Sequence, residues 1–228
     1  MKRYACYCMT RNIYHKVIPS LRSLLAHADL DEVYLITEDD DVGFALPEKV
    51  RIINVSDQTF FPPDGANTNC RWTYMALMRV ALCHVLPWAD RVLALDLDTI
   101  VTEDINDLWK APIDNHYMAG CREPAKSQYG LYINGGVVLW NLKKMRDGKA
   151  DEIIRALNER KYAFPEQDCM NALCRGHIYE LGGEYNSSSV TVNRHIARIV
   201  HFAATRGWYE KEPLVQMYKG DFADDEQG

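Results

Sequence analysis

The sequence has no apolar run long enough to span a bilayer. The apolar stretch near the N-terminus, residues 4–9, is too short to form the core of a signal peptide and ends at a polar Thr-Arg-Asn. None of the seven cysteines belongs to a Cys-x-x-Cys pair, which argues against a zinc site. We therefore expect a cytoplasmic protein with free, mostly buried thiols.

An excess of basic residues is also missing. The chain has 26 lysines and arginines against 32 aspartates and glutamates, a net charge of −6, which argues against a generic nucleic-acid-binding protein. There is no internal repeat, low-complexity segment or linker. A length of 228 residues is enough for one substantial core, so the sequence predicts a single domain over residues 1–228, with a polar, acidic end at 221–228 that frays.

Hydrophobic periodicity predicts strands that alternate with helices in the first half of the chain. The strands are 4–9, 33–37, 50–55 and 91–95, and the helices are 14–28 and 71–86. This alternation favours a largely parallel sheet with helices on both faces. The second half is more mixed, with strands at 116–121, 132–140 and 196–203 and helical segments at 143–146, 151–160 and 166–174. The acidic run 38–41 is interpreted as a solvated loop without chemistry.

Two carboxylates, Asp96 and Asp98, stand at the end of the apolar strand 91–95. In an extended chain, side chains two positions apart point to the same side, so both can meet one hard cation. Mg²⁺ or Mn²⁺ held by a few carboxylates commonly binds a phosphate. The alternative is that the acidic residues only mark where the strand emerges into water.

Other segments surround this pair in a fixed order along the chain. They are Tyr7-Cys-Met-Thr-Arg-Asn-Ile-Tyr14, Arg79 at seventeen residues before Asp96, Asp104-Ile-Asn-Asp-Leu-Trp109, Tyr132-Ile-Asn-Gly-Gly-Val-Val-Leu-Trp-Asn141, Pro165-Glu-Gln-Asp-Cys-Met-Asn171 and Ile199-Val-His-Phe-Ala-Ala-Thr-Arg-Gly-Trp208. Together they resemble glycosyltransferase family 8, the group of glycogenin and the bacterial lipooligosaccharide galactosyltransferases. The resemblance runs over about residues 4–209. It implies an α/β protein of the GT-A fold, one Rossmann-like domain with a mostly parallel central sheet flanked by helices.

The resemblance also implies a UDP-sugar donor bound through Mn²⁺, with Mg²⁺ as a substitute. The metal ligands would be Asp96, Asp98 and His201. Uracil and ribose would be held by Thr10, Asn12 and Tyr14, whose ring can stack on a base. Arg79 and Arg206 would bind the donor as cations, with Arg206 in place of a lysine and one residue out of the family register. The alternatives are that Thr10 or Asn12 caps a helix and that Arg79 lies at the surface.

By the same resemblance, the catalytic residues would be Asn134 and Gln167, with Glu166 replacing the usual aspartate. Asn134 would contact the donor sugar and Gln167 would lie near its anomeric carbon. Gly135 and Gly136 would let the backbone approach the sugar, unless they only form a β-bulge. Two further departures from the family are Ala94 in place of an aromatic residue and Ala204 in place of glycine.

We therefore predict a retaining hexosyltransferase that uses UDP-glucose or UDP-galactose. Gln167 would stabilise positive charge while the acceptor attacks from the side of the leaving group. The acceptor is open: a saccharide, a lipid-linked glycan or a protein hydroxyl. Because the acidic end should be repelled by anionic lipid, we expect no autonomous membrane binding. Since His201 binds metal only when neutral, activity should fall at acid pH.

Two other functions are compatible with parts of the sequence. A sugar-nucleotide nucleotidyltransferase shares a Rossmann-like core, but it requires a glycine-rich loop after the first strand, and Cys8-Met-Thr-Arg-Asn has no glycine. A non-catalytic or degenerate nucleotide-sugar-binding protein would explain Glu166 and the shortened segment after His201. A UDP-sugar hydrolysis assay distinguishes the transferase from the non-catalytic protein.

Overall fold

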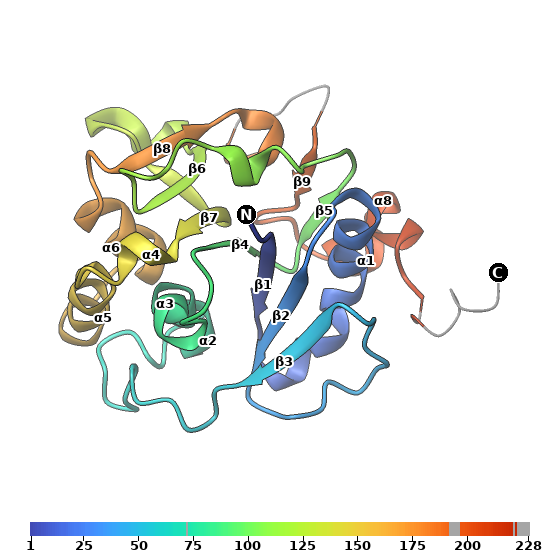
Figure 1. The fold of residues 1–228 in the computed structure, drawn as a ribbon, viewed down its shortest axis with the longest axis horizontal. Coiled ribbons are helices and arrows are strands. Elements are labelled where there is room, and N and C mark those ends of the chain that lie inside the picture. Colours follow the sequence, from blue (N-terminus) through green and yellow to red (C-terminus); the bar gives the residue numbers. More distant parts are fainter. Residues whose placement is uncertain (72, 192–196, 221, 223–228) are drawn as a thin grey trace.

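A seven-stranded sheet with helices on both faces forms the centre of the computed structural model, which describes residues 1–71, 73–191, 197–220 and 222 (Figure 1). Its strand order is β3-β2-β1-β4-β7-β6-β8. The first four strands run parallel, β7 is antiparallel to both of its neighbours, and β8 is parallel to β6. The bounds are Val50–Asn54 for β3, Glu32–Thr37 for β2, Tyr4–Cys8 for β1, Arg91–Leu95 for β4, Ile133–Asn141 for β7, Met118–Arg122 for β6 and Ile178–Leu181 for β8. The predicted mixed α/β fold with a mostly parallel sheet is confirmed.

A second, smaller sheet pairs β5, Thr99–Val101, with β9, Ile199–His201, in antiparallel register. It lies beside α1, Val17–His27, on one side of the main sheet (Figure 1). α7, Trp208–Lys211, and α8, Pro213–Met217, follow β9, and α8 packs on α1. No helix in the described part of the chain is both long enough and apolar enough to cross a membrane.

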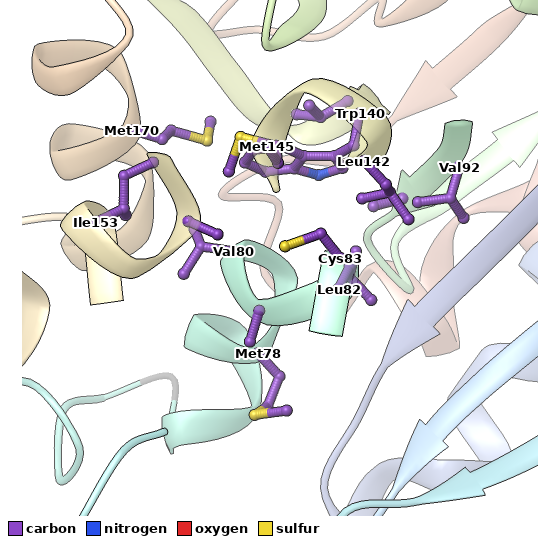
Figure 2. Packing of buried hydrophobic residues seen from close by; sticks show 14 of the residues in the cluster. Met78, Val80, Leu82, Cys83, Val92, Trp140, Leu142, Met145, Ile153 and Met170 are labelled. Atoms are coloured by element: carbon purple, nitrogen blue, oxygen red, sulfur yellow. The ribbon is translucent and has the colours of Figure 1, made fainter. Parts of the chain in front are cut away.

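The other face of the sheet is covered by the remaining α-helices (Figure 1). These are α2 (Thr73–Leu77), α3 (Leu82–Val85), α4 (Leu142–Met145), α5 (Lys149–Glu159) and α6 (Pro165–Leu173). Figure 2 shows the core under them, where Met145 lies against Trp140 and Cys83 lies between Val80 and Leu142. Short 3₁₀ helices complete the fold: η1 (Arg11–Lys16), η2 (Met78–Ala81), η3 (Leu108–Lys110), η4 (Pro124–Tyr129) and η5 (Gly183–Tyr185).

Strand β1 shows how the sequence supplies both cores. Successive side chains of a strand point to opposite faces of a sheet. Tyr4 and Cys6 therefore belong to the hydrophobic cluster under α2–α6, whereas Ala5 and Tyr7 belong to the cluster under α1. Since both faces are buried, the strand has a continuous apolar sequence, as expected for a parallel sheet covered by helices.

Several predicted elements differ in extent. The predicted helix 71–86 is divided into α2, η2 and α3, because its middle turn, which carries the buried Arg79, is 3₁₀. The predicted helix 14–28 likewise begins with η1. Strands β5 and β8 and helices α7 and α8 were not predicted, because each has at most five residues and shows no clear period. Within the predicted strand 196–203, the structure contains β9, Ile199–His201. Trp72 and Ile196 lie outside the described residues. So do residues 221 and 223–228 of the end that was predicted to fray.

The order of the strands defines where a ligand can enter. From β1 the chain proceeds through β2 to β3 on one side, and then returns to place β4 on the other side. In open α/β sheets, ligands bind in the crevice outside the carboxyl ends of strands at such a reversal. The segments that follow β1 and β4 therefore meet at one edge of the sheet, and they begin with Met9 and Asp96.

Candidate active site

Asp96, Asp98 and His201 come together at this edge of the sheet. Nε2 of His201 lies 3.2 Å from Oδ1 of Asp98 and 3.8 Å from Oδ2 of Asp96. One ligand atom from each residue lies within 4.8 Å of the other two. The histidine is buried and the two carboxylates are partly exposed, so the site is open on the side of the carboxylates.

Local hydrogen bonds and the small sheet build this cluster. Asp96 and Asp98 lie in a turn after β4 and not in the extended chain that the sequence suggested. The hydroxyl of Thr99 closes the turn by donating to the backbone carbonyl of Asp96, at 2.8 Å. Thr99 also pairs with His201 across β5 and β9, which brings the imidazole to the turn.

The carboxylates and the imidazole of the cluster shift each other's pKa values. Burial acts to lower the pKa of His201, but Asp98 and Asp96 outweigh it, so the pKa of His201 is raised above its usual value. Burial acts to raise the pKa of Asp98, and His201 outweighs it, so the pKa of Asp98 is lowered. Two carboxylate oxygens and one imidazole nitrogen form a donor set that suits a divalent cation.

Gly135 and Gly136 allow side chains of the protein itself to approach β7. A Cβ on Gly136 would collide with the imidazole of His201. A Cβ on Gly135 would lie 3.2 Å from Oε1 of Gln167 and 3.3 Å from Oε1 of Glu166. The pairing of β6 with β7 also shifts its register across this stretch, so the irregularity that the sequence allowed is present. Because these two glycines have no Cβ, the side chains of His201, Gln167 and Glu166 can pack directly against β7.

Arg79 is bound by carboxylates of the protein. Its guanidinium donates at 2.7 Å to Oδ1 of Asp96 and at 2.7 Å to the carbonyl of Gly135, and it also donates to Oε1 of Glu166. The residue is 8 % exposed, so it is not the surface arginine of the alternative interpretation. Burial raises the pKa of Glu166, and Arg79 offsets only part of that effect. Arg79 therefore joins the candidate metal site to the first turn of α6.

Gln167 and Asn134 lie together with a third residue that the sequence analysis did not identify, Glu123. Gln167 Nε2 donates to Oε2 of Glu123 at 3.1 Å, and Asn134 Nδ2 donates to the same oxygen at 3.1 Å. Glu123 is 7 % exposed and pairs with Lys126 at 3.4 Å. Its position after a predicted strand, like that of Asp96, was the signal that could have identified it.

Thr10, Asn12 and Tyr14 lie at the carboxyl end of β1. The hydroxyl of Thr10 donates to Oδ1 of Asn12 at 2.9 Å, and Thr10 makes no side-chain cap on η1, so the capping alternative is not observed for this residue. The Tyr14 side chain is 5 % exposed and packs in the core, which weighs against a base stacking on its ring. Its hydroxyl donates to Asp39 at 3.0 Å.

The acidic run 38–41 is a partly exposed loop, as predicted, but two of its side chains have partners near the candidate site. Asp39 forms a two-point ion pair with Arg11, at 2.6 and 2.8 Å, and Tyr74 donates to Oε1 of Glu38 at 3.0 Å. The reason is topological, because β2 lies beside β1 and both carboxyl ends reach the same edge of the sheet. The run thus borders the segment that carries Thr10.

The loop after β9 carries the remaining expected residue, Arg206, which is exposed. Ala204, which stands where the family has glycine, adopts a φ of 61°. This is the left-handed region that glycine enters without steric cost, so the family's preference has a backbone reason at this position.

Comparisons with known proteins agree with this geometry. The profile of "Glycosyl transferase family 8" matches residues 7–210. The chain is 32 % identical over 162 residues to a lipopolysaccharide 1,2-glucosyltransferase of Escherichia coli, covering 57 % of this chain and 48 % of the other. It is 32 % identical over 100 residues to glycosyltransferase GlyE of Streptococcus pneumoniae, covering 42 % of this chain and 24 % of the other. The chain thus spans less than half the length of these curated relatives.

The fold has a close counterpart among solved structures. The galactosyltransferase LgtC, solved with donor and acceptor sugar analogues, superposes with a TM-score of 0.71 at 17 % identity, over 98 % of this chain and 99 % of that chain. At this identity the likeness supports the GT-A fold alone. The profile match covers far more than half of the sequence, and the chain belongs to glycosyltransferase family 8.

Proposed function

We propose that this protein is a single-domain, retaining hexosyltransferase that transfers glucose or galactose from UDP to a hydroxyl acceptor. The observation that carries the proposal is the cluster of Asp96, Asp98 and His201 at the strand reversal of a family 8 chain. The similarity to a lipopolysaccharide 1,2-glucosyltransferase supports a hexose as the transferred group and a saccharide as the acceptor.

The metal would be Mn²⁺, held by Asp96, Asp98 and His201, with Mg²⁺ as a weaker substitute. When bound, the cation would neutralise charge on the diphosphate leaving group. Arg206, on the exposed loop after His201, would add a second positive charge there. Thr10 and Asn12, at the carboxyl end of β1, would bind the nucleoside, with Tyr14 behind them holding Asp39.

On the sugar side, Gln167 would stabilise positive charge at the anomeric carbon. Its Oε1 accepts from the backbone N–H of Gly135 at 2.7 Å and more weakly from Nδ2 of Asn134 at 3.4 Å, and it would turn the weakly held lone pair to the sugar. Asn134 would contact the sugar, and Glu166 would do so while held by Arg79. Glu123 is a weak nucleophile here, because Lys126 and two amides hold its charge. The acceptor would therefore attack from the side of the leaving group, and a glycosyl adduct trapped on a side chain would contradict this mechanism.

Thermal unfolding with nucleotides tests the donor site. A ligand that binds only the folded state raises the melting temperature by mass action. We expect UDP to do so with Mn²⁺ and not with EDTA, and GDP, CDP and ATP to have smaller effects. The Asp98→Asn variant should lose the effect, whereas Asp57→Asn, which changes an exposed carboxylate outside the site, should keep it. If no nucleotide shifts unfolding in the presence of metal, the proposed donor site is wrong.

Hydrolysis of UDP-sugars then distinguishes an enzyme from a binding protein. We expect slow, Mn²⁺-dependent release of hexose to water, because a transferase without its acceptor usually transfers to water at a low rate. Binding of UDP without any hydrolysis, and without transfer to saccharide, lipid-linked or protein acceptors, would indicate the non-catalytic alternative.

A further inference from the structure

A chain of hydrogen bonds connects the backbone of β7 to the imidazole of the candidate metal site. The N–H of Gly136 donates to Oδ1 of Asn134 at 2.9 Å. Nδ2 of Asn186 donates to the same oxygen at 3.0 Å, and Oδ1 of Asn186 lies 2.9 Å from Nδ1 of His201. All three side chains are buried, Asn186 completely. Asn186 follows η5 directly and lies between His201 and Asn134.

The donor and the acceptor of each hydrogen bond in this series can be deduced from the first bond. A backbone N–H can only donate, so the atom of Asn134 that faces Gly136 must be the oxygen. The group of Asn186 that faces this oxygen must then be the NH₂, which places the Asn186 oxygen against Nδ1 of His201. An amide oxygen only accepts, so Nδ1 carries the proton. In the neutral imidazole, Nε2 is then the nitrogen with the free lone pair, and it is the one that faces Asp96 and Asp98.

The same chain extends to the sugar side of the site. Because Oδ1 of Asn134 is committed to Gly136 and Asn186, its NH₂ must point the other way, where it lies 3.1 Å from Oε2 of Glu123 and 3.4 Å from Oε1 of Gln167. The N–H of Gly135 also fixes that oxygen of Gln167. One buried amide, Asn186, thus joins the imidazole to the two amides proposed to act on the sugar.

We propose that Asn186 is a positioning residue that serves both ends of the site. It holds the neutral His201 with its proton on Nδ1, so that Nε2 is ready to bind a cation. Through Asn134 it also keeps the amide of Gln167 in one orientation. This inference rests on the proposed metal-dependent function, since it assigns a role around the same three ligands.

The amide of Asn186 both donates to Asn134 and accepts from His201. An aspartate could accept from Nδ1 of His201 but could not donate to Asn134, and a leucine could do neither. The backbone around Asn186 is itself fixed, because its carbonyl accepts from the hydroxyl of Thr191 and its N–H donates to the carbonyl of Gly183 at 3.3 Å. Substitution of Asn186 should therefore change its side-chain contacts and leave the backbone in place. Asn186→Asp removes the contact with Asn134, and Asn186→Leu removes both contacts.

The first test uses the unmodified protein without metal. Long-range proton–nitrogen NMR at about pH 9, where an imidazole is neutral, reports which ring nitrogen is protonated. We expect His201 to carry its proton on Nδ1, with Nε2 unprotonated. A proton on Nε2 would overturn the proposal without any reference to enzyme activity.

The second test compares variants by Mn²⁺ titration calorimetry. Asn186→Leu should weaken Mn²⁺ binding by about tenfold or more, as loss of a partner behind a metal-binding histidine typically does. Asn186→Asp should retain Mn²⁺ affinity within about threefold, because His201 keeps its acceptor. The aspartate variant should still lose the extra affinity of the UDP-sugar over UDP, because Asn134 has lost its donor. Unchanged Mn²⁺ affinity in a folded Asn186→Leu protein would refute the proposal.

A matched control separates this role from general destabilisation. Asn67 is another buried asparagine, with its NH₂ bonded to the carbonyls of Leu157 and Arg160. Asn67→Leu should lower the melting temperature and leave Mn²⁺ affinity unchanged. If Asn186→Leu does not fold, the aspartate variant and the NMR measurement still decide the matter. Failure of the unmodified protein to bind Mn²⁺ would instead contradict the proposed function.

Discussion

Gly136 and His201 are packed so closely that no side chain larger than hydrogen fits between β7 and the imidazole. The neighbouring Gly135 is less confined, because a Cβ there would meet the ends of two flexible side chains, Gln167 and Glu166. The two glycines therefore serve different halves of the site, one the metal ligand and the other the sugar side.

This difference predicts two distinct alanine phenotypes. Gly136→Ala should displace His201, weaken Mn²⁺ binding by about tenfold or more and cost about 1–3 kcal/mol of stability. Gly135→Ala should leave Mn²⁺ affinity nearly unchanged and lower UDP-sugar hydrolysis, because it shifts Gln167. Calorimetry with Mn²⁺ and urea unfolding measure both effects, and equal loss of metal affinity in the two variants would contradict the assignment.

Removal of Arg79 should destabilise the fold strongly. Arg79→Met leaves the buried Glu166 without its cation, which costs about 3 kcal/mol in comparable sites. The matched control is Arg122→Ala, which breaks an exposed pair with Glu180 and should cost less than about 1 kcal/mol. Urea unfolding measures the loss in free energy of unfolding for both variants. Similar losses would mean that the ion pair of Arg79 with Glu166 contributes little to stability.

Metal affinity should depend on pH through His201. A proton and a metal compete for Nε2, and the raised pKa of His201 lets this competition begin above its usual titration range. The lowered pKa of Asp98 keeps that carboxylate ionised throughout the same range. Mn²⁺ affinity should therefore fall by about tenfold for each pH unit below the pKa of His201. Calorimetry from pH 8 to about pH 6 checks this, and an affinity that does not change would exclude His201 as a ligand.

Thiol reactivity should follow burial. All seven cysteines are free, and only Cys8 and Cys70 are partly exposed. Burial raises the pKa of the Cys83 thiol to about 11 and that of the Cys174 thiol to about 12, so both stay protonated and unreactive. A chromogenic disulfide reagent should thus modify at most two thiols rapidly in the folded protein and all seven in urea. Fast modification of more than two would show that the fold opens in solution.

Local patterns in the sequence were sufficient to predict much of the fold. The strands of the first half, including the one that ends at Asp96 and Asp98, follow from short apolar runs, and the helices follow from a 3.6-residue period; both patterns depend only on near neighbours. The order of motifs was sufficient to identify the family, which the profile match confirms. Elements of three to five residues, such as β5 and β8, were not predicted because so short a segment shows no clear period.

The family resemblance predicted that His201 joins Asp96 and Asp98, but only the tertiary structure shows how they meet. The pairing of β5 with β9 brings His201 to Asp98, and no local pattern of the sequence predicts that pairing. Glu123 and Asn186 belong to the site because both bind the side chain of Asn134. Glu123 follows β6 and Asn186 follows η5, so the fold brings both to β7. A buried charge or amide must find partners wherever packing places it, and those partners are set by long-range contacts that no local pattern encodes.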